Sequence, residues 1–162
     1  MKTAIVYYSM SGNTKYVAGK VAAGAGADLI EIAPEKKFPA KGLRKFLVGG
    51  RSAVTGATPA LLPYEFKAEE YDRVVIATPV WASSPAPPLN TFIKDNREAL
   101  GEKKIALILC FRGGGADKAA AKVKELTGCG EFEAELVLVD PKKNAGYDVD
   151  KKIAEFVKKI TE

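Results

Sequence analysis

Residues 4–14 read AIVYYSMSGNT and carry the clearest indication of the fold in this chain. The first five residues are a continuous apolar run, which is typical of a strand buried on both faces of a parallel sheet. Small hydroxyl residues, a glycine and an asparagine follow, and they lead into the helical spacing of Val17, Ala18 and Val21. A strand, a short polar loop and a helix therefore open the chain, as in the first unit of an α/β domain.

The same alternation continues along the rest of the chain. Further apolar runs predict strands at residues 29–32, 74–77, 105–109 and 136–139. Helical spacing predicts helices over residues 89–100, 116–126 and 149–160. Gly101 and Gly128 stand where two of these helices would end. The run at 29–32 contains Glu31 and is expected at a sheet edge, whereas the other strands are expected to be buried on both faces. This pattern predicts a doubly wound α/β domain, with helices on both faces of a five-stranded parallel sheet and right-handed crossovers.

One stretch departs from this alternation. Residues 34–72 separate the second and third predicted strands, and they are longer than a crossover helix requires. A short helix is predicted at residues 43–48, followed by Gly49-Gly50 and a segment punctuated by proline at residues 59–63. Because no repeat, low-complexity tract or linker supports a second domain, we expect one domain over residues 1–162 with an extended insertion at 34–72.

The insertion also carries the excess charge. The chain has 25 Lys and Arg against 20 Asp and Glu, a net charge of +5 at pH 7. Residues 34–52 contain Glu35 and the basic residues Lys36, Lys37, Lys41, Arg44, Lys45 and Arg51. Two interpretations stay open: a docking surface for an acidic protein or for NADPH, and an ordinary solvated helix face. Nucleic acid is not expected as a partner, because no recognition motif accompanies the charge.

Composition excludes several kinds of chemistry. The chain has no histidine, so a Ser-His-Asp triad, a histidine base and a histidine-ligated metal are all excluded. Cys110 and Cys129 are too few for a disulfide framework or an all-thiolate zinc site, and we interpret both as structural. We therefore expect no metal and no catalytic side chain, with the chemistry supplied by a cofactor.

Targeting features are also missing from the sequence. The first apolar run is too short for a signal peptide, and no apolar stretch reaches the roughly 18 residues of a membrane span. A cytoplasmic protein without membrane insertion is the expectation, and its oligomeric state stays open.

Three loops follow the carboxyl ends of predicted strands, where open α/β sheets bind ligands. The first loop (residues 9–14) is Ser9-Met10-Ser11-Gly12-Asn13-Thr14, and its hydroxyls and free backbone N–H groups suit a phosphate. The second loop (residues 78–88) begins Thr78-Pro79-Val80-Trp81-Ala82-Ser83, and its tryptophan, the only one in the chain, could stack on a planar ring. The third loop (residues 110–115) is Cys110-Phe111-Arg112-Gly113-Gly114-Gly115, whose glycines let the backbone approach a ligand closely.

Each loop taken alone has an ordinary structural alternative. These alternatives are a Ser/Asn helix cap, a tryptophan packed under its own loop, and a flexible glycine turn. Arg112 is either solvated or a positive charge beside a bound ring, where it would favour electron uptake by that ring. A receiver domain, which shares this fold, is excluded because Tyr8-Ser9 and Thr78-Pro79 stand where it needs acidic residues.

Taken together, the three loops resemble those of the flavodoxin family, in its short-chain, FMN-binding form, and the resemblance covers essentially the whole chain. The first loop matches the family's hydroxyl-x-hydroxyl-Gly-x-Thr phosphate loop, and Trp81 matches the aromatic residue that flanks the flavin. The run TPVWASSPAPPLNTF (residues 78–92) is similar to a subgroup of small flavodoxin-like proteins. This resemblance implies the strand order 2-1-3-4-5 and FMN as the cofactor.

The resemblance also implies a role for each loop. Ser9, Met10, Ser11, Gly12, Asn13 and Thr14 would hold the FMN phosphate. Thr78, Pro79, Val80, Trp81, Ala82 and Ser83 would contact the flavin ring, and Phe111, Arg112, Gly113, Gly114 and Gly115 would give backbone donors to its pyrimidine edge. Two positions depart from the family pattern. Lys15 stands where the family often has an acidic residue, and Ala82 stands where many members have glycine, so a positive φ there would cost about 1 kcal/mol.

Three functions are compatible with these features. The resemblance implies an FMN-binding electron carrier that shuttles electrons between redox partner proteins. The first alternative is an FMN-dependent NAD(P)H oxidoreductase of quinones or similar small acceptors, and the second is a partner-binding module without flavin. Whether the protein is an enzyme is left open, because a fold specifies a cofactor more firmly than a reaction.

Overall fold

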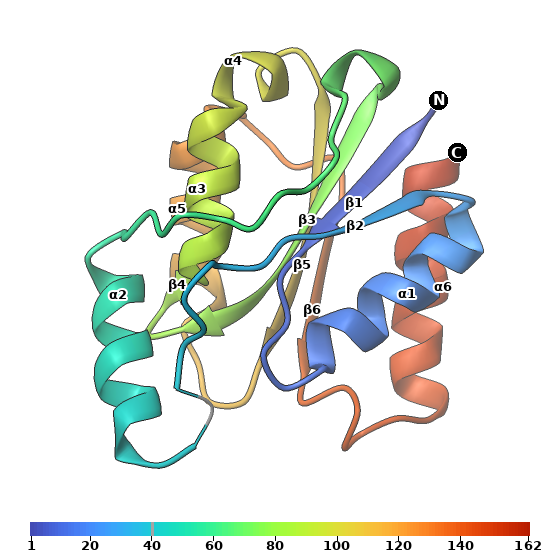
Figure 1. The fold of residues 1–162 in the computed structure, drawn as a ribbon. Coiled ribbons are helices and arrows are strands. Elements are labelled where there is room, and N and C mark those ends of the chain that lie inside the picture. The colour runs from blue at the N-terminus through green and yellow to red at the C-terminus, as the bar shows by residue number, and fades with distance from the viewer. Residues whose placement is uncertain (40) are drawn as a thin grey trace.

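A parallel sheet forms the centre of the computed structural model, which describes residues 1–39 and 41–162 except for the side chains of Lys45 and Phe46. The predicted charge of Lys45 therefore lies outside the described residues. The strands, in spatial order, are β2 (Asp28–Glu31), β1 (Thr3–Tyr7), β3 (Arg73–Trp81), β5 (Lys104–Phe111) and β6 (Glu135–Val139). A short β4 (Ser84–Pro85) pairs antiparallel with the end of β3. The five parallel strands have the flavodoxin-like order 2-1-3-4-5, so the predicted fold class is confirmed (Figure 1).

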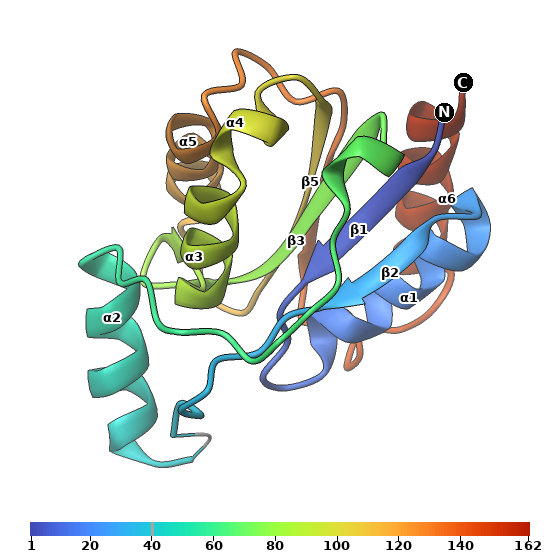
Figure 2. The same ribbon diagram turned by 45° about the horizontal axis from the view of Figure 1, so that its top comes forward.

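Helices cover both faces of this sheet, as Figures 1 and 2 show. On one face lie α1 (Asn13–Ala25) and α6 (Tyr147–Thr161), and on the other lie α3 (Pro87–Asp95), α4 (Arg97–Leu100) and α5 (Ala116–Thr127). Successive strand residues point to opposite faces, so Val75 joins the core under α1 and α6 while Val74 and Ile76 join the core under α3 and α5. The central strands β1, β3 and β5 are therefore buried on both faces.

The two edge strands behave differently from each other and from the prediction. β2 lies at one edge with only Ile30 partly buried, as its interruption by Glu31 indicated. The prediction that residues 136–139 are buried on both faces is wrong, because β6 forms the other edge. Leu136 and Leu138 pack into the core, whereas Val137 and Val139 are 38% and 50% exposed. An edge strand with only one face covered alternates in burial even when its sequence is continuously apolar.

Helix boundaries also differ from the sequence at two places. The helix predicted over 89–100 is interrupted at Asn96, whose side-chain amide donates to the Phe92 carbonyl at 2.8 Å. The helix predicted at 43–48 does not stop at the glycines. It continues through a π-helical turn, η1 (Lys45–Gly50), into α2 (Arg51–Val54).

The rest of the insertion runs along the edge of the domain. Residues 33–35 and 60–62 pair antiparallel, with the Leu62 amide donating to the Ala33 carbonyl at 2.8 Å. A short η2 (Ala68–Glu70) then leads into β3. On α3, the Thr91 hydroxyl donates to the Pro59 carbonyl at 2.7 Å, which ties the insertion to the body of the domain.

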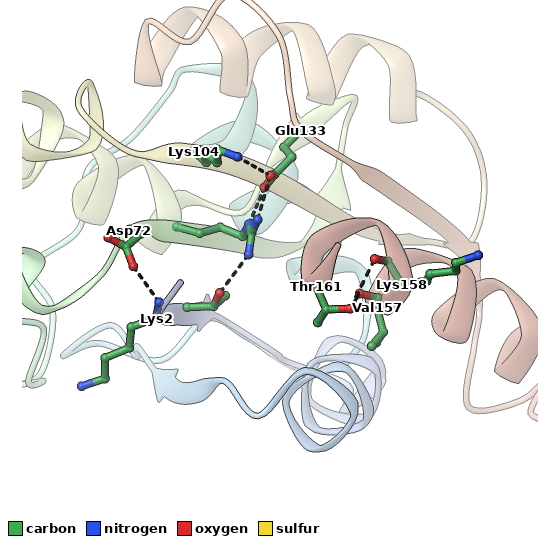
Figure 3. Close-up of polar contacts among 9 residues, drawn as sticks. Lys2, Asp72, Lys104, Glu133, Val157, Lys158 and Thr161 are labelled. Atoms are coloured by element: carbon green, nitrogen blue, oxygen red, sulfur yellow. Dashed lines mark hydrogen bonds and ion pairs between the residues drawn. The ribbon is translucent and has the colours of Figure 1, made fainter.

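An ion-pair cluster closes the end of the sheet where β3 and β5 begin (Figure 3). The Arg73 guanidinium is 2% exposed and makes a bidentate contact with the Glu133 carboxylate, one arm at 2.7 Å. The Lys104 ammonium approaches the same carboxylate at 3.2 Å. The hydrogen bond from Arg73, supported by Lys104, holds the pKa of Glu133 below its ordinary value.

The described ranges contain neither a helix that could span a membrane nor a cluster of metal-binding side chains. Within residues 1–39 and 41–162, every helix is too short or too polar to cross a bilayer. The same residues bring together no group of three or more histidine, cysteine, aspartate or glutamate side chains that could hold a metal ion.

Candidate functional site

The first, second and third loops meet around one cavity of about 570 Å³ at the carboxyl ends of β1, β3 and β5. The first loop contributes Met10, Ser11 and Asn13 to its walls, the second contributes residues 79–83, and the third contributes residues 110–114. This is the size and position of a small-molecule or cofactor site in an open α/β sheet. Most of the residues predicted to bind a ligand are thus brought together in one place.

The other predicted residues are not among those that line the cavity: Ser9, Gly12, Thr14, Thr78 and Gly115. The Ser9 hydroxyl accepts a hydrogen bond from the Gly12 amide at 3.1 Å and so braces the first loop. The Thr78 hydroxyl accepts from the Ala86 amide at 3.0 Å and braces the second loop. Direct ligand contacts by these residues stay predictions.

The first loop leaves the beginning of α1 free of side-chain caps. No side chain of the described residues caps the helix, and Gly12, at φ +88°, is its N-cap residue. Thr14, in the first helical turn, is 1% exposed, and its hydroxyl has no oxygen or nitrogen partner within the described part of the chain, with only the weakly bonding Cys110 thiol beside it. Buried hydroxyls are normally satisfied, so this atom fits a ligand acceptor at the helix N-terminus. Lys15 lies outside this arrangement, with its ammonium 3.5 Å from the Glu31 carboxylate.

Trp81 forms a fixed wall of the cavity. Its ring makes edge contacts with Tyr8, at a centroid distance of 5.7 Å, and with Phe38, at 5.3 Å. A Cβ atom added to Gly49 would lie 3.5 Å from the indole ring, so η1 packs its bare backbone against the tryptophan. Burial raises the pKa of the neighbouring Tyr8 to about 12, which keeps its hydroxyl neutral. The insertion therefore holds Trp81 in place.

A strained hairpin turn continues the wall. Ala82 and Ser83 connect β3 to β4 with φ angles of +47° and +59°, which is the backbone of a type I′ turn. The positive φ that a glycine would adopt easily at position 82 is present even though the residue is alanine. Gly115 makes the turn possible, because a Cβ there would lie 2.2 Å from the Ser83 hydroxyl. The Lys122 ammonium donates to the Ser84 hydroxyl and holds β4 against α5.

The third loop brings one charge and one inert thiol. Arg112 is exposed, and its guanidinium lies 3.5 Å from the Asp140 carboxylate. Burial raises the pKa of the Cys110 thiol to about 12, against a smaller opposing effect of its hydrogen bond with the Thr14 hydroxyl. A thiol with this pKa stays protonated at neutral pH and is not a nucleophile.

Three residues near the site were missed by the sequence reasoning. Gly50 lines the cavity from the insertion, and Asp140 and Lys142 reach the first loop from the segment after β6. That segment also follows a strand's carboxyl end, so the rule that selected the other loops could have selected it. Gly50 had no comparable feature, because only the fold brings the insertion to the cavity.

A family model for flavodoxins matches residues 2–159. The chain belongs to the flavodoxin family. Among solved structures, it is similar to a flavoprotein in complex with FMN from Lactobacillus acidophilus, with 24% identity, 93% and 97% of the two chains covered, and a TM-score of 0.72. A candidate flavoprotein from Bacteroides uniformis has 21% identity, 97% coverage of both chains and a TM-score of 0.76. The two-electron reduced flavodoxin of Megasphaera elsdenii has 14% identity, coverage of 97% and 99%, and a TM-score of 0.62.

A comparison with curated proteins gave no significant match. The similarity to these structures, below 25% identity, supports the fold of this flavodoxin-family chain and not its reaction.

Proposed function

We propose that this flavodoxin-family protein binds FMN in the three-loop cavity and transfers electrons between redox partners. The cavity carries the proposal, since Ser11 and Asn13, at the N-terminus of α1, line it together with the aromatic wall at Trp81. The first loop would hold the phosphate, Trp81 would flank the ring, and the bare backbone of Gly113 and Gly114 would face the ring edge. FMN would supply the chemistry by accepting one or two electrons, and the protein would bind and orient it.

The surface of the insertion supports a carrier that meets a charged partner. Lys36, Lys37, Lys41, Arg44 and Arg51 are all exposed, and none of them forms an ion pair within the described part of the chain. Leu43 and Leu47 lie on the helical segment that also carries Arg44 and Arg51, and they are 74% and 61% exposed. Because Gly49 and Gly50 of this segment border Trp81 and the cavity, a partner bound here would lie beside the cofactor.

The first test is reconstitution with FMN followed by stepwise anaerobic reduction. The proposal expects stoichiometric FMN binding and long-wavelength absorption from half-reduced flavin midway through the titration. Direct passage to fully reduced flavin, with steady consumption of NADH or NADPH in the presence of a quinone, would instead favour the oxidoreductase. Failure to bind FMN would leave the partner-binding module.

The second test measures the local charge with two oxidants of the reduced protein. Ferricyanide is an anion and benzoquinone is neutral. The ratio of the ferricyanide oxidation rate to the benzoquinone oxidation rate therefore reports the electrostatic field beside the cofactor. We expect the ratio to fall several-fold as salt rises, and to fall likewise when Lys36 and Lys37 are both changed to Glu. The matched control changes Lys151 and Lys152 to Glu on α6, across the sheet, and should alter the ratio little (Figure 1). Equal ratios in all three proteins would contradict a docking role for the insertion.

A further inference from the structure

The segment between β6 and α6 is built into the first loop. Its first residue, Asp140, has φ +40°, and its amide donates to the Phe111 carbonyl at 2.8 Å. Asn144 closes the turn, since its side chain donates to the Val139 carbonyl at 2.9 Å and its amide donates to the Asp140 carbonyl at 3.0 Å. These bonds fix the path of the chain from β6 across the carboxyl edge of the sheet.

Asn13 joins this segment to the first loop through both ends of its side-chain amide. Its Nδ2 donates to the Asp140 carboxylate at 2.9 Å, and its Oδ1 accepts from the Lys142 backbone amide at 3.1 Å. Asn13 is 8% exposed, so the connection is shielded from water. The backbone of Lys142 is therefore held in register with the first loop, and one donor and one acceptor of the Asn13 side-chain amide are already used.

This connection carries the Lys142 side chain over Gly12. A Cβ atom added to Gly12 would lie 3.2 Å from the Lys142 ammonium nitrogen and 3.7 Å from its Cδ. No carboxylate of the described residues pairs with this ammonium. Gly12 stands at the N-terminus of α1, two residues before Thr14, whose hydroxyl is buried. The first loop itself contains no cationic side chain, so Lys142 brings a full positive charge to it from a different part of the chain.

We propose that Lys142 is a phosphate-binding residue, which neutralises a phosphate monoester dianion held at the first loop. Asp140 and Asn13 act as positioning residues that set the lysine backbone on the loop. The inference rests on the proposed function in taking FMN as the ligand, and it names the cation that pairs with the FMN phosphate. The uncharged loop would supply directional hydrogen bonds, while Lys142 would supply affinity that depends on salt.

The test compares FMN, riboflavin and inorganic phosphate as ligands of three variants. In Lys142→Met the ammonium is lost and the apolar stem kept, Lys142→Arg restores the charge, and Lys143→Met is the matched control at the neighbouring exposed lysine. For Lys142→Met we expect the FMN dissociation constant to rise about tenfold, as for loss of one charge-assisted hydrogen bond. Riboflavin affinity should not change, and the salt dependence of FMN binding should weaken. Lys142→Arg and Lys143→Met should behave nearly as the unmodified protein.

The outcomes separate this inference from the proposed function. If FMN affinity and its salt dependence are the same in Lys142→Met as in the unmodified protein, the role of Lys142 is overturned while FMN binding stands. Equal losses for riboflavin and FMN would overturn it as well, because the lysine would then act on the ring. If the unmodified protein binds neither flavin, the proposed function fails. Even then, the lysine site would be supported if the unmodified protein broadens the phosphorus-31 NMR signal of inorganic phosphate and Lys142→Met does not. No broadening by the unmodified protein would overturn it.

Discussion

Among the glycines around the cavity, Gly115 has the least room for a side chain. Its φ is +88°, and an added Cβ would lie 2.8 Å from the Ser83 Cα, which is backbone that cannot rotate away. We expect Gly115→Ala to lower the free energy of unfolding by about 3 kcal/mol, because positive-φ strain and overpacking add. Urea unfolding measures this. Gly113→Ala is the control, since nothing lies within 4 Å of its added Cβ and it should change stability by less than about 1 kcal/mol. Equal losses in the two variants would contradict the steric role of Gly115.

The same residue shows what the sequence could and could not predict at this scale. Three consecutive glycines predict a close approach by the backbone, and at Gly115 that approach exists. The sequence places it against a ligand, however, whereas the structure places Gly115 against Ser83. A glycine in the sequence can indicate a close contact at its position. Which atom makes that contact depends on the fold, because the atom belongs to another segment of the chain.

At the scale of the elements, two glycines of α1 differ in what faces them. An added Cβ on Gly19 meets nothing within 4 Å, whereas one on Gly24 would lie 3.2 Å from a Val157 methyl group of α6. Gly19→Ala should raise the free energy of unfolding by about 1 kcal/mol through helix propensity. Gly24→Ala should give a smaller gain or a loss, because α1 and α6 would have to separate slightly. Thermal unfolding of both variants checks this, and equal gains would mean that the contact between the helices adapts freely.

Helices and strands were predictable where their own sequence determines them. They were less predictable where contacts with other segments determine them. The apolar runs predicted every strand of the parallel sheet, and the stripe of Val149, Ile153, Phe156 and Ile160 predicted α6. The helix at the insertion was predicted to end before Gly49-Gly50, because glycine disfavours helix interiors. Instead the helix continues, and the missing side chains let Trp81 pack against its backbone. A tertiary contact outweighs the local propensity there.

For the whole molecule, the Arg73–Glu133 pair anchors the end of the sheet away from the cavity. Removing the carboxylate in Glu133→Ala leaves the buried guanidinium without its main partner, so we expect a loss of about 3 kcal/mol at pH 7. The folded pKa of Glu133 is lowered, so the stability it contributes is present above the ordinary carboxyl pKa, about 4.3, and is lost as pH falls through the lowered value.

Urea unfolding at pH 7 and pH 3 tests this linkage. The difference in unfolding free energy between Glu133→Ala and the unmodified protein should shrink at the lower pH. Glu131→Ala is the control, because the Glu131 carboxylate is 87% exposed and its ion pair with Lys124 should contribute little at either pH. A difference that is the same at both pH values would contradict the assignment.

The arrangement of strands and helices was the most predictable feature of the molecule, and the contacts that form the site were the least predictable. Buried strands alternating with helices leave few topologies once crossovers must be right-handed, so the sheet and its two helical layers followed from the sequence pattern. The contact of Asn13 with Asp140 spans 127 positions, and the insertion reaches Trp81 from a different part of the chain. No local pattern records which distant segments meet, so Asp140, Lys142 and Gly50 became visible only in the folded chain.

The packing of Trp81 against η1 gives the molecule a built-in optical reporter. All indole emission of the protein comes from one ring, which borders the cavity on one side and the insertion on the other. A bound chromophore would quench this emission by energy transfer, whereas movement of the insertion away from the ring would admit water and shift the emission to the red. Intensity and wavelength therefore report separately on the two events, and a single unlabelled sample would show whether the insertion moves when the cavity fills.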